Sequence, residues 1–439
     1  MTERTRTSAT RPRILALACI VLLLFAACSG DGNSTATSTA TEAAPTALAS
    51  ASPSASTSAT PSGALPAAPT GPLDVDRAMQ HVRALSVDIG IRAAGTEGER
   101  QAARYIADVF TSQGYTTEIE QFTFRMRFDD AVVTLPGGRQ ITSRILDGSG
   151  EGKVSGILVD GGTGQTDQIV EAEGRVVLMR RGGLPFAQKV ANAQQAGAVA
   201  VLVVNTEDRP FRGTIGGQRV AIPALAIDGK EWNALRAVLG QSVTVDAPGA
   251  RSVTSQNVVA RRGTACRAYI GAHYDSVPEG PGANDNASGT ATMLEVARTQ
   301  RADGLCAIAF GSEEVGLYGS QAFVAKHLAG GATFMLNFDM TGRIDRPVII
   351  GDEALTQQIL GIVGTTQPLR AGRFHPFASS DHVSFASVGV PAVTMTSGDD
   401  PNIHTARDTF DAIRKDDLKA VMAVCEQALV GLLRASGIR

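Results

Sequence analysis

Residues 268–289 read Ala-Tyr-Ile-Gly-Ala-His-Tyr-Asp-Ser-Val-Pro-Glu-Gly-Pro-Gly-Ala-Asn-Asp-Asn-Ala-Ser-Gly, and a helical pattern follows over 289–301. A short apolar run that ends in polar and glycine-rich residues is typical of a buried strand followed by a loop. The same order recurs to the end of the chain, with strands expected at 306–310, 333–338, 346–350 and 392–396 and helices at 319–327, 354–364 and 415–435. This alternation predicts an α/β fold with a mostly parallel, doubly wound sheet that helices cover on both faces.

Acidic and histidine side chains follow the ends of the expected strands. The candidates are His273, Asp275, Asp285, Glu313, Glu314, Asp339 and His404. In open α/β sheets ligands bind beside the carboxyl ends of the strands, so we expect these side chains to share one edge of the sheet. Imidazole and carboxylate groups together suit Zn²⁺.

The number of separated positions decides between one metal ion and two. A catalytic zinc takes about three protein ligands, whereas separate positions are available at His273, Asp285, Glu314, Asp339 and His404. Two zinc ions that share one bridging carboxylate would use all of them and leave a place for hydroxide between the ions. The ligand set therefore predicts a hydrolase with two Zn²⁺.

Individual roles follow from spacing. His273 and Asp275 stand two apart at a strand end, so both side chains point to the same side and Asp275 can fix the tautomer of the imidazole. The adjacent Glu313 and Glu314 repel each other unless a cation neutralises one of them. We therefore expect Glu314 to bind metal and Glu313 to act as the general base. His382 is the remaining polar candidate for catalysis.

Structural interpretations of these motifs stay open when each motif is taken alone. Asp285 lies in a glycine- and asparagine-rich loop that opens a helix, where a carboxylate could serve only as a helix cap. The acidic pair could be a solvated turn, and an isolated His-x-Asp is common. Their occurrence together favours the metal site.

The ordered set of motifs resembles the co-catalytic dizinc exopeptidases, a family that includes aminopeptidases and glutamate carboxypeptidase. The motifs are His273-x-Asp275, Asn284-Asp285-Asn286-Ala-Ser-Gly289, Phe310-x-x-Glu313-Glu314-x-Gly316-Leu-x-Gly319-Ser320, Asn337-x-Asp339-Met, Ser380-Asp381-His382 and Ile403-His404-Thr405-x-x-Asp408. The resemblance covers 255–439 and the segment 92–96.

The resemblance assigns a role to each ligand. It implies His273 and Asp339 as terminal ligands of one zinc, Glu314 and His404 of the other, Asp285 as the bridge and Glu313 as the base. It also implies a cis peptide between Asp285 and Asn286. One departure concerns the oxyanion donor, because no tyrosine follows Tyr318, whereas the family commonly offers one in or just before the Ser-Asp-His region. His382, or a zinc ion alone, would then have to replace it.

The sequence pattern of residues 131–247 differs from that of the rest of the chain. Short β runs at 156–159, 175–179 and 198–204 surround one helix at 186–196, and no cluster of acids or histidines lies among them. This insertion is similar to a protease-associated domain, and we expect it to shape access to the metal cleft. The catalytic domain then consists of 73–130 and 248–439.

The first 28 residues read as a bacterial lipoprotein signal. Four arginines precede an apolar run at 14–27 that is too short for a comfortable membrane span. Leu24-Phe25-Ala26-Ala27-Cys28 resembles a lipobox, with phenylalanine where leucine is preferred, so Cys28 is expected to carry the lipid. The alternative is an ordinary cleaved signal with an incidental cysteine. Residues 29–72 are rich in Ser, Thr, Ala and Pro and predict a disordered tether. The expected location is extracytoplasmic, anchored to the bacterial cell membrane.

Composition limits the partners. The chain has 439 residues with 43% hydrophobic content and a formal net charge of −3, so there is no basic surplus for binding nucleic acid. The expected partners are peptide substrates, and the expected membrane contact is only the lipid at Cys28. A monomer is expected.

Three cysteines remain beyond Cys28. Cys266 lies seven positions before His273, and Cys306 lies seven before Glu313. If the two strands are parallel neighbours, these cysteines lie at the same height and predict a disulfide that leaves Cys425 free. The alternative is that all three are small buried apolar residues.

Three classes of function compete. The leading hypothesis is an exopeptidase that removes N-terminal residues, with both zinc ions and the Glu313 base in place. A single-zinc acyltransferase of the glutaminyl cyclase type would not need both His273 and Asp339, and an inactive receptor-like binding module would have lost ligands. The identity of the cleaved residue, and the choice between a free N-terminus and a free C-terminus, stay open.

Overall fold

The structure is a computed structural model that describes residues 71–216, 220–328, 332–343, 347–365, 368–374, 378–398 and 400–438. The predicted signal segment, Cys28 and the tether up to residue 70 lie outside the described residues. Within those that are described, no helix combines the length and apolar character that crossing a bilayer requires.

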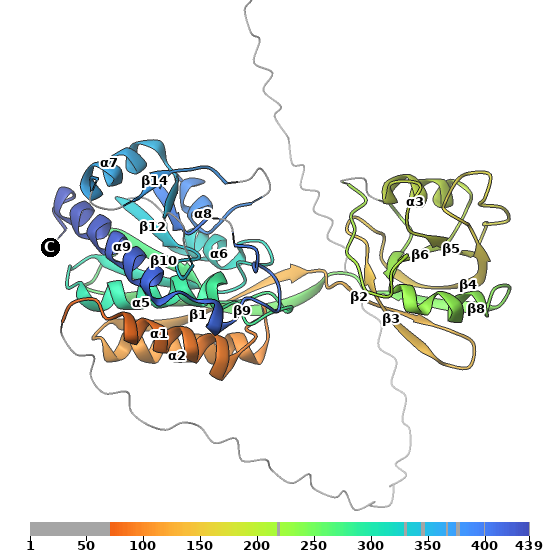
Figure 1. The fold of residues 1–439 in the computed structure, drawn as a ribbon, viewed down its shortest axis with the longest axis horizontal. Coiled ribbons are helices and arrows are strands. Elements are labelled where there is room, and N and C mark those ends of the chain that lie inside the picture. The colour runs from red at the N-terminus through yellow and green to blue at the C-terminus, as the bar shows by residue number, and fades with distance from the viewer. Residues whose placement is uncertain are drawn as a thin grey trace, which may run out of the picture. The chain divides into compact units, whose positions relative to one another are not determined.

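The chain before and after the insertion forms one eight-stranded sheet (Figure 1). Its strands are β1 Thr116–Met126, β9 Arg251–Arg261, β10 Ala268–His273, β11 Leu305–Phe310, β12 Phe334–Phe338, β13 Val348–Gly351, β14 Arg370–Ala371 and β15 Ala392–Thr396. The spatial order is β1-β9-β11-β10-β12-β15-β13-β14. The strands β11, β10, β12 and β15 are parallel, as predicted, whereas β9 and β13 run antiparallel to their neighbours β11 and β15.

Helices cover both faces of this sheet, which confirms the predicted architecture. They are α1 Val75–Arg83, α2 Glu97–Ser112, α5 Gly289–Thr299, α6 Tyr318–His327, α7 Glu353–Val363, α8 His382–Ala386 and α9 Lys415–Ala435. Side chains alternate along β10, so Ile270 packs with α1, α2, α5 and α9 while Tyr269 packs with Phe323 and Phe385 of α6 and α8. Two apolar layers therefore hold the parallel strands rigidly.

The insertion forms a separate closed barrel with the strand order β2-β3-β7-β6-β5-β4-β8. The strands are β2 Asp130–Thr134, β3 Gln140–Ile145, β4 Gly152–Asp160, β5 Val176–Arg180, β6 Ala200–Val204, β7 Ala224–Ile227 and β8 Ser242–Ala247, and the helices are α3 Phe186–Gln195 and α4 Trp232–Arg236. Its apolar residues pack into two cores of their own. The chain enters the barrel from β1 and leaves it into β9, which pair with each other along their whole length.

The predicted disulfide between Cys266 and Cys306 is present, with Cα atoms 5.5 Å apart, and Cys425 is buried and free. The reasoning from equal height was wrong, however. Cys306 lies opposite Tyr269 in the sheet register, and Cys266 precedes β10. Arg267 N–H donates to the Gly304 carbonyl, so the segment just before β10 lies beside the segment just before β11.

Candidate metal centre

Two groups of ligand-type side chains meet at one edge of the sheet. One group is His273, Asp285 and Asp339, the other is Asp285, Glu314 and His404, and within each group the ligand atoms lie within 4.8 Å of one another. Asp285 belongs to both groups. All five predicted metal ligands are thus brought together.

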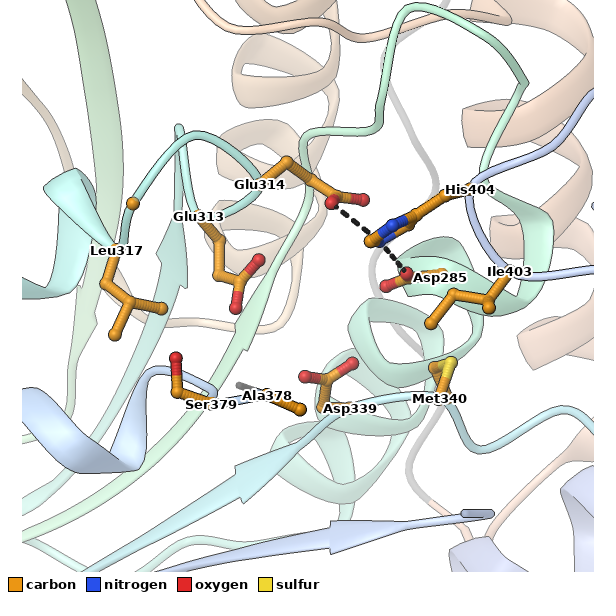
Figure 2. A pocket seen from close by; sticks show the side chains of 11 residues that line it. Asp285, Glu313, Glu314, Leu317, Asp339, Met340, Ala378, Ser379, Ile403 and His404 are labelled. Atoms are coloured by element: carbon orange, nitrogen blue, oxygen red, sulfur yellow. Dashed lines mark ion pairs between the residues drawn. The ribbon is translucent and has the colours of Figure 1, made fainter. Parts of the chain in front are cut away.

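The two oxygens of Asp285 face different histidines. His273 Nε2 lies 3.2 Å from Oδ1, and His404 Nε2 lies 3.2 Å from Oδ2. The remaining carboxylates complete the pattern, since Asp339 lies 3.5 Å from His273 Nε2 and Glu314 lies 3.0 Å from His404 Nε2. Figure 2 shows His404 between Glu314 and Asp285, with the ion pairs drawn as dashed lines. Each oxygen of Asp285 thus faces one histidine, and each histidine has a further carboxylate beside it.

Adjacent parallel strands bring these residues together. His273 is the last residue of β10, Asp339 directly follows β12, and Glu313 and Glu314 follow β11 by three and four positions. Because β11, β10 and β12 are consecutive neighbours in the sheet, their ends lie side by side. His404 comes from the loop that follows β15.

Asp285 does not cap a helix, so that structural interpretation is wrong. It lies in the irregular turn Ala283–Ser288 before α5 with φ −110° and ψ 87°, and the N-cap of α5 is Ser288. The peptide between Asp285 and Asn286 is cis, as the resemblance implied. The carboxylate is directed to the two imidazoles instead of to helix amides.

Asp275 and Ser380 contact two of the candidate ligands, His273 and Asp339. Asp275 Oδ1 lies 3.4 Å from His273 Nδ1, and its two oxygens accept the backbone N–H groups of Glu313 and Glu314 at 3.0 and 3.2 Å. Ser380 Oγ donates to Asp339 Oδ2 at 2.6 Å. Such contacts fix the orientation of metal-binding side chains.

Proteins of a known peptidase family are similar to this chain in sequence. The sequence model described as "Peptidase family M28" matches residues 257–429, and the one described as "PA domain" matches 153–235. The Mycobacterium tuberculosis protein named "Probable lipoprotein aminopeptidase LpqL" is 30% identical over 417 residues, which cover 79% of this chain and 82% of that protein. This chain belongs to peptidase family M28.

Further similarities agree with this membership in M28. Aminopeptidase YwaD of Bacillus subtilis is 29% identical over 380 residues, covering 79% of this chain and 82% of that protein. The solved zinc aminopeptidase BSAP from Bacillus subtilis superposes with a TM-score of 0.67 at 27% identity, over 83% of this chain and 95% of that one. An aminopeptidase from Aneurinibacillus sp. strain AM-1 gives 0.58 at 30% identity, over 81% and 93%. The predicted family, fold, metallopeptidase class and protease-associated insertion are confirmed.

Several carboxylates are buried close together at the M28 centre, so bound cations would stabilise their charged forms. Burial raises the pKa of Glu313 well above its usual range, and Asp381, Asp339 and Glu314 raise it further against the effect of His273. Burial and the Asp285 carboxylate raise the pKa of Glu314 to about 7. Burial alone would raise the pKa of Asp285, but hydrogen bonds from His273 and His404 hold it well below its usual range. Divalent cations would relieve the repulsion between these acids, so the donor set fits zinc.

His382 belongs to neither group of ligand-type side chains. Its Nδ1 contacts Thr394 Oγ1 at 2.7 Å, and its ring lines a separate cavity with Asp352 and Gly389. Burial lowers its pKa to about 4. His382 is not among the residues that line the cavity at the ligands. The prediction of a catalytic role for His382 therefore finds no support in this geometry.

Two residues at the M28 centre had no predicted role. The Asp408 carboxylate accepts the backbone N–H groups of Asn284 and Asp285 at 2.7 and 2.9 Å. Arg92 is fully buried beside the loop that leads to Asp285. Asp408 follows His404 by four positions within a quoted motif, which was a usable signal, whereas the position of Arg92 depends on contacts across 180 residues or more.

Proposed function

We propose that this M28 peptidase is a zinc-dependent aminopeptidase that holds two zinc ions and removes N-terminal residues from peptides. The observation that carries this proposal is Asp285, whose two oxygens each face one histidine at 3.2 Å. Two separate groups of ligands would be superfluous for a single zinc ion. The printed names of YwaD, LpqL and BSAP, all aminopeptidases, support the reaction class.

The ligands divide between two metal positions. His273 and Asp339 would hold one zinc, Glu314 and His404 would hold the other, and Asp285 would bind both. When bound, zinc ions of this kind make a water molecule more acidic and polarise a carbonyl oxygen. Asp275 keeps His273 oriented, and Ser380 does the same for Asp339.

Glu313 is the group that moves the proton. Its carboxylate lines the cavity, and it belongs to neither group of ligands. The nearest imidazole contact, to His273 Nε2, is 3.9 Å long. A carboxylate with a raised pKa beside the ligands accepts a proton from the attacking water and delivers it to the leaving amine.

The cavity beside the ligands has a volume of about 320 Å³, which suits one side chain better than a long peptide segment. Its apolar wall consists of Leu317, Met340 and Ile403, and Ser379 directs its hydroxyl toward the cavity (Figure 2). Within the described part of the chain, no tyrosine lines it. We infer a preference for apolar N-terminal residues.

A panel of chromogenic aminoacyl amides tests this function. The purified protein loaded with zinc should cleave the leucyl amide at least about ten times faster, by kcat/KM, than the aspartyl amide, because burying a charge against this wall is costly. Acetylation of the leucyl amine should abolish cleavage. Cleavage of the acetylated amide would contradict an aminopeptidase, and full activity after zinc has been removed with a chelator would contradict its dependence on zinc.

We also propose that Cys28 carries a lipid that anchors the peptidase outside the cytoplasm. The lipobox-like sequence before Cys28 and the printed name of LpqL support this anchor. Replacing Cys28 with serine should move most of the protein from the membrane fraction to the medium, because the covalent lipid is lost. A Cys28→Ser protein that stays in the membrane fraction as completely as wild type would rule the anchor out.

A further inference from the structure

Arg92 is a buried cation that the proposed reaction does not use. It precedes α2 and has no exposed surface. Its guanidinium donates only to main-chain carbonyls, namely those of Tyr274 at 2.6 Å, Leu85 at 3.0 Å, Gly90 at 2.8 Å, Pro281 at 2.6 Å and Gly282 at 3.0 Å. The fork of five N–H donors in arginine suits such a ring of acceptors, whereas the single ammonium of lysine does not.

Three of the five carbonyls, those of Tyr274, Pro281 and Gly282, come from the two ends of one loop. Tyr274 directly follows the ligand His273, and Gly282 lies three residues before the bridging Asp285. Arg92 therefore fixes the distance between the start and the end of the loop that joins these two ligands. The backbone N–H of Arg92 adds a bond to Ser276 Oγ at 3.0 Å inside the same loop.

A second side chain, Asp408, also holds this loop, but it accepts hydrogen bonds where Arg92 donates them. Asp408 accepts the N–H groups of Asn284 and Asp285, whereas Arg92 donates to the carbonyls of Pro281 and Gly282. Gly282 has φ +54°, and a Cβ atom there would lie 2.2 Å from the Asp285 carbonyl oxygen. The backbone before the bridging carboxylate is thus packed too closely for a side chain at Gly282.

Burial of the Arg92 charge is costly unless something compensates for it. None of the ion pairs between described residues involves its guanidinium, and burial lowers its pKa to about 10, a value at which it still carries its charge at neutral pH. Asp275, Asp408, Glu314 and Asp285 act on it at longer range in the opposite direction. Arg92 thus places one permanent positive charge behind the acids of the metal centre.

We propose that Arg92 is a positioning residue that sets the separation between His273 and Asp285 and thereby the affinity of the centre for zinc. The proposal rests on the proposed zinc site, and it assigns Arg92 no contact with substrate. Residues that orient metal ligands from outside the coordination sphere typically contribute a factor of about 10 to 100 in metal affinity.

The test compares Arg92→Lys with Arg298→Lys. Arg298 is a matched control because it is also buried, pairs with Glu295 at 2.9 Å and donates to the Pro72 carbonyl, yet it lies at the end of α5 remote from Asp285. For each protein, zinc affinity is measured by competition with a chelator, thermal midpoints are measured with and without zinc, and kcat and KM are measured at saturating zinc.

Both variants should lower the thermal midpoint of the metal-free protein. Only Arg92→Lys should bind zinc at least about tenfold more weakly and lose much of the rise in midpoint that zinc produces. Its kcat should fall by about tenfold, with KM within about threefold of wild type, because the substrate wall is intact. An Arg92→Lys protein with wild-type zinc affinity and kcat would overturn the proposal.

A second variant covers a failure of Arg92→Lys to fold. Asp408→Asn keeps Arg92 but replaces one acceptor oxygen with an NH₂ group facing a backbone N–H, so it should also weaken zinc binding. Wild-type zinc affinity in Asp408→Asn, together with an unfolded Arg92→Lys, would overturn the positioning role. A wild-type protein that binds zinc but cleaves no aminoacyl amide would overturn the proposed function alone, since the readout here is zinc affinity.

Discussion

Replacing Glu313 with glutamine should lower kcat by on the order of 10²-fold or more while both zinc ions stay bound. The amide has nearly the shape of the carboxylate but cannot accept the proton of the attacking water. Glu313 belongs to neither ligand group, so metal content should not change. The measurements are steady-state kinetics with a leucyl amide and elemental analysis of zinc per chain.

Glu314→Gln is the matched control for this variant. The side chain is the immediate neighbour in sequence, but its Oε2 lies 3.0 Å from the ligand His404. It should therefore lose zinc as well as activity. Retained activity in Glu313→Gln, or zinc lost from Glu313→Gln as readily as from Glu314→Gln, would mean that Glu313 is not the base.

Removal of a single histidine should distinguish a centre with two zinc ions from a centre with one. His404→Ala takes away a ligand of only one position, so the protein should retain about one zinc per chain where wild type retains about two. Its kcat should fall by on the order of 10³-fold, because only one ion would then be available to supply the chemistry of the centre. Metal analysis after dialysis against a weak chelator gives the stoichiometry.

His382→Ala provides the comparison within the same residue type. Its ring lines a separate cavity, so zinc content should equal that of wild type and kcat should stay within a few-fold. One zinc per chain in the wild-type protein would refute the two-ion centre. Loss of zinc from His382→Ala would show that this imidazole belongs to the centre after all.

The parallel part of the fold was predictable because its strands are buried on both faces and read as continuous apolar runs. β15 and α9 have the bounds that the pattern predicted. β9 was not foreseen, since its residues are partly polar and it is defined by pairing with β1 across the insertion. Closure of the barrel likewise depends on β2 meeting β8, a long-range contact that no local pattern encodes.

The convergence of the candidate ligands was predictable because each follows a recognisable strand, and their order along the chain is specific. The direction of the His382 side chain could not be predicted, because sequence adjacency to Ser380 says nothing about direction, and in the structure its imidazole contacts Thr394. Arg92 shows the opposite case. Its role as a positioning residue depends on carbonyls contributed by three separate segments, and carbonyls have no signature in a sequence.

The bond between Cys266 and Cys306 spans 40 residues of sequence. Those residues include His273, Asp285 and all of α5. If another protease cut the chain once at the exposed Pro278, the two fragments would still be joined covalently, and the ligands on either side of the cut would stay on one molecule. Such a nicked enzyme would run as one band on a non-reducing gel and as two bands after reduction. This peptidase is expected to work outside the cytoplasm. There, the disulfide would keep both halves of the ligand loop on one molecule after a single cleavage.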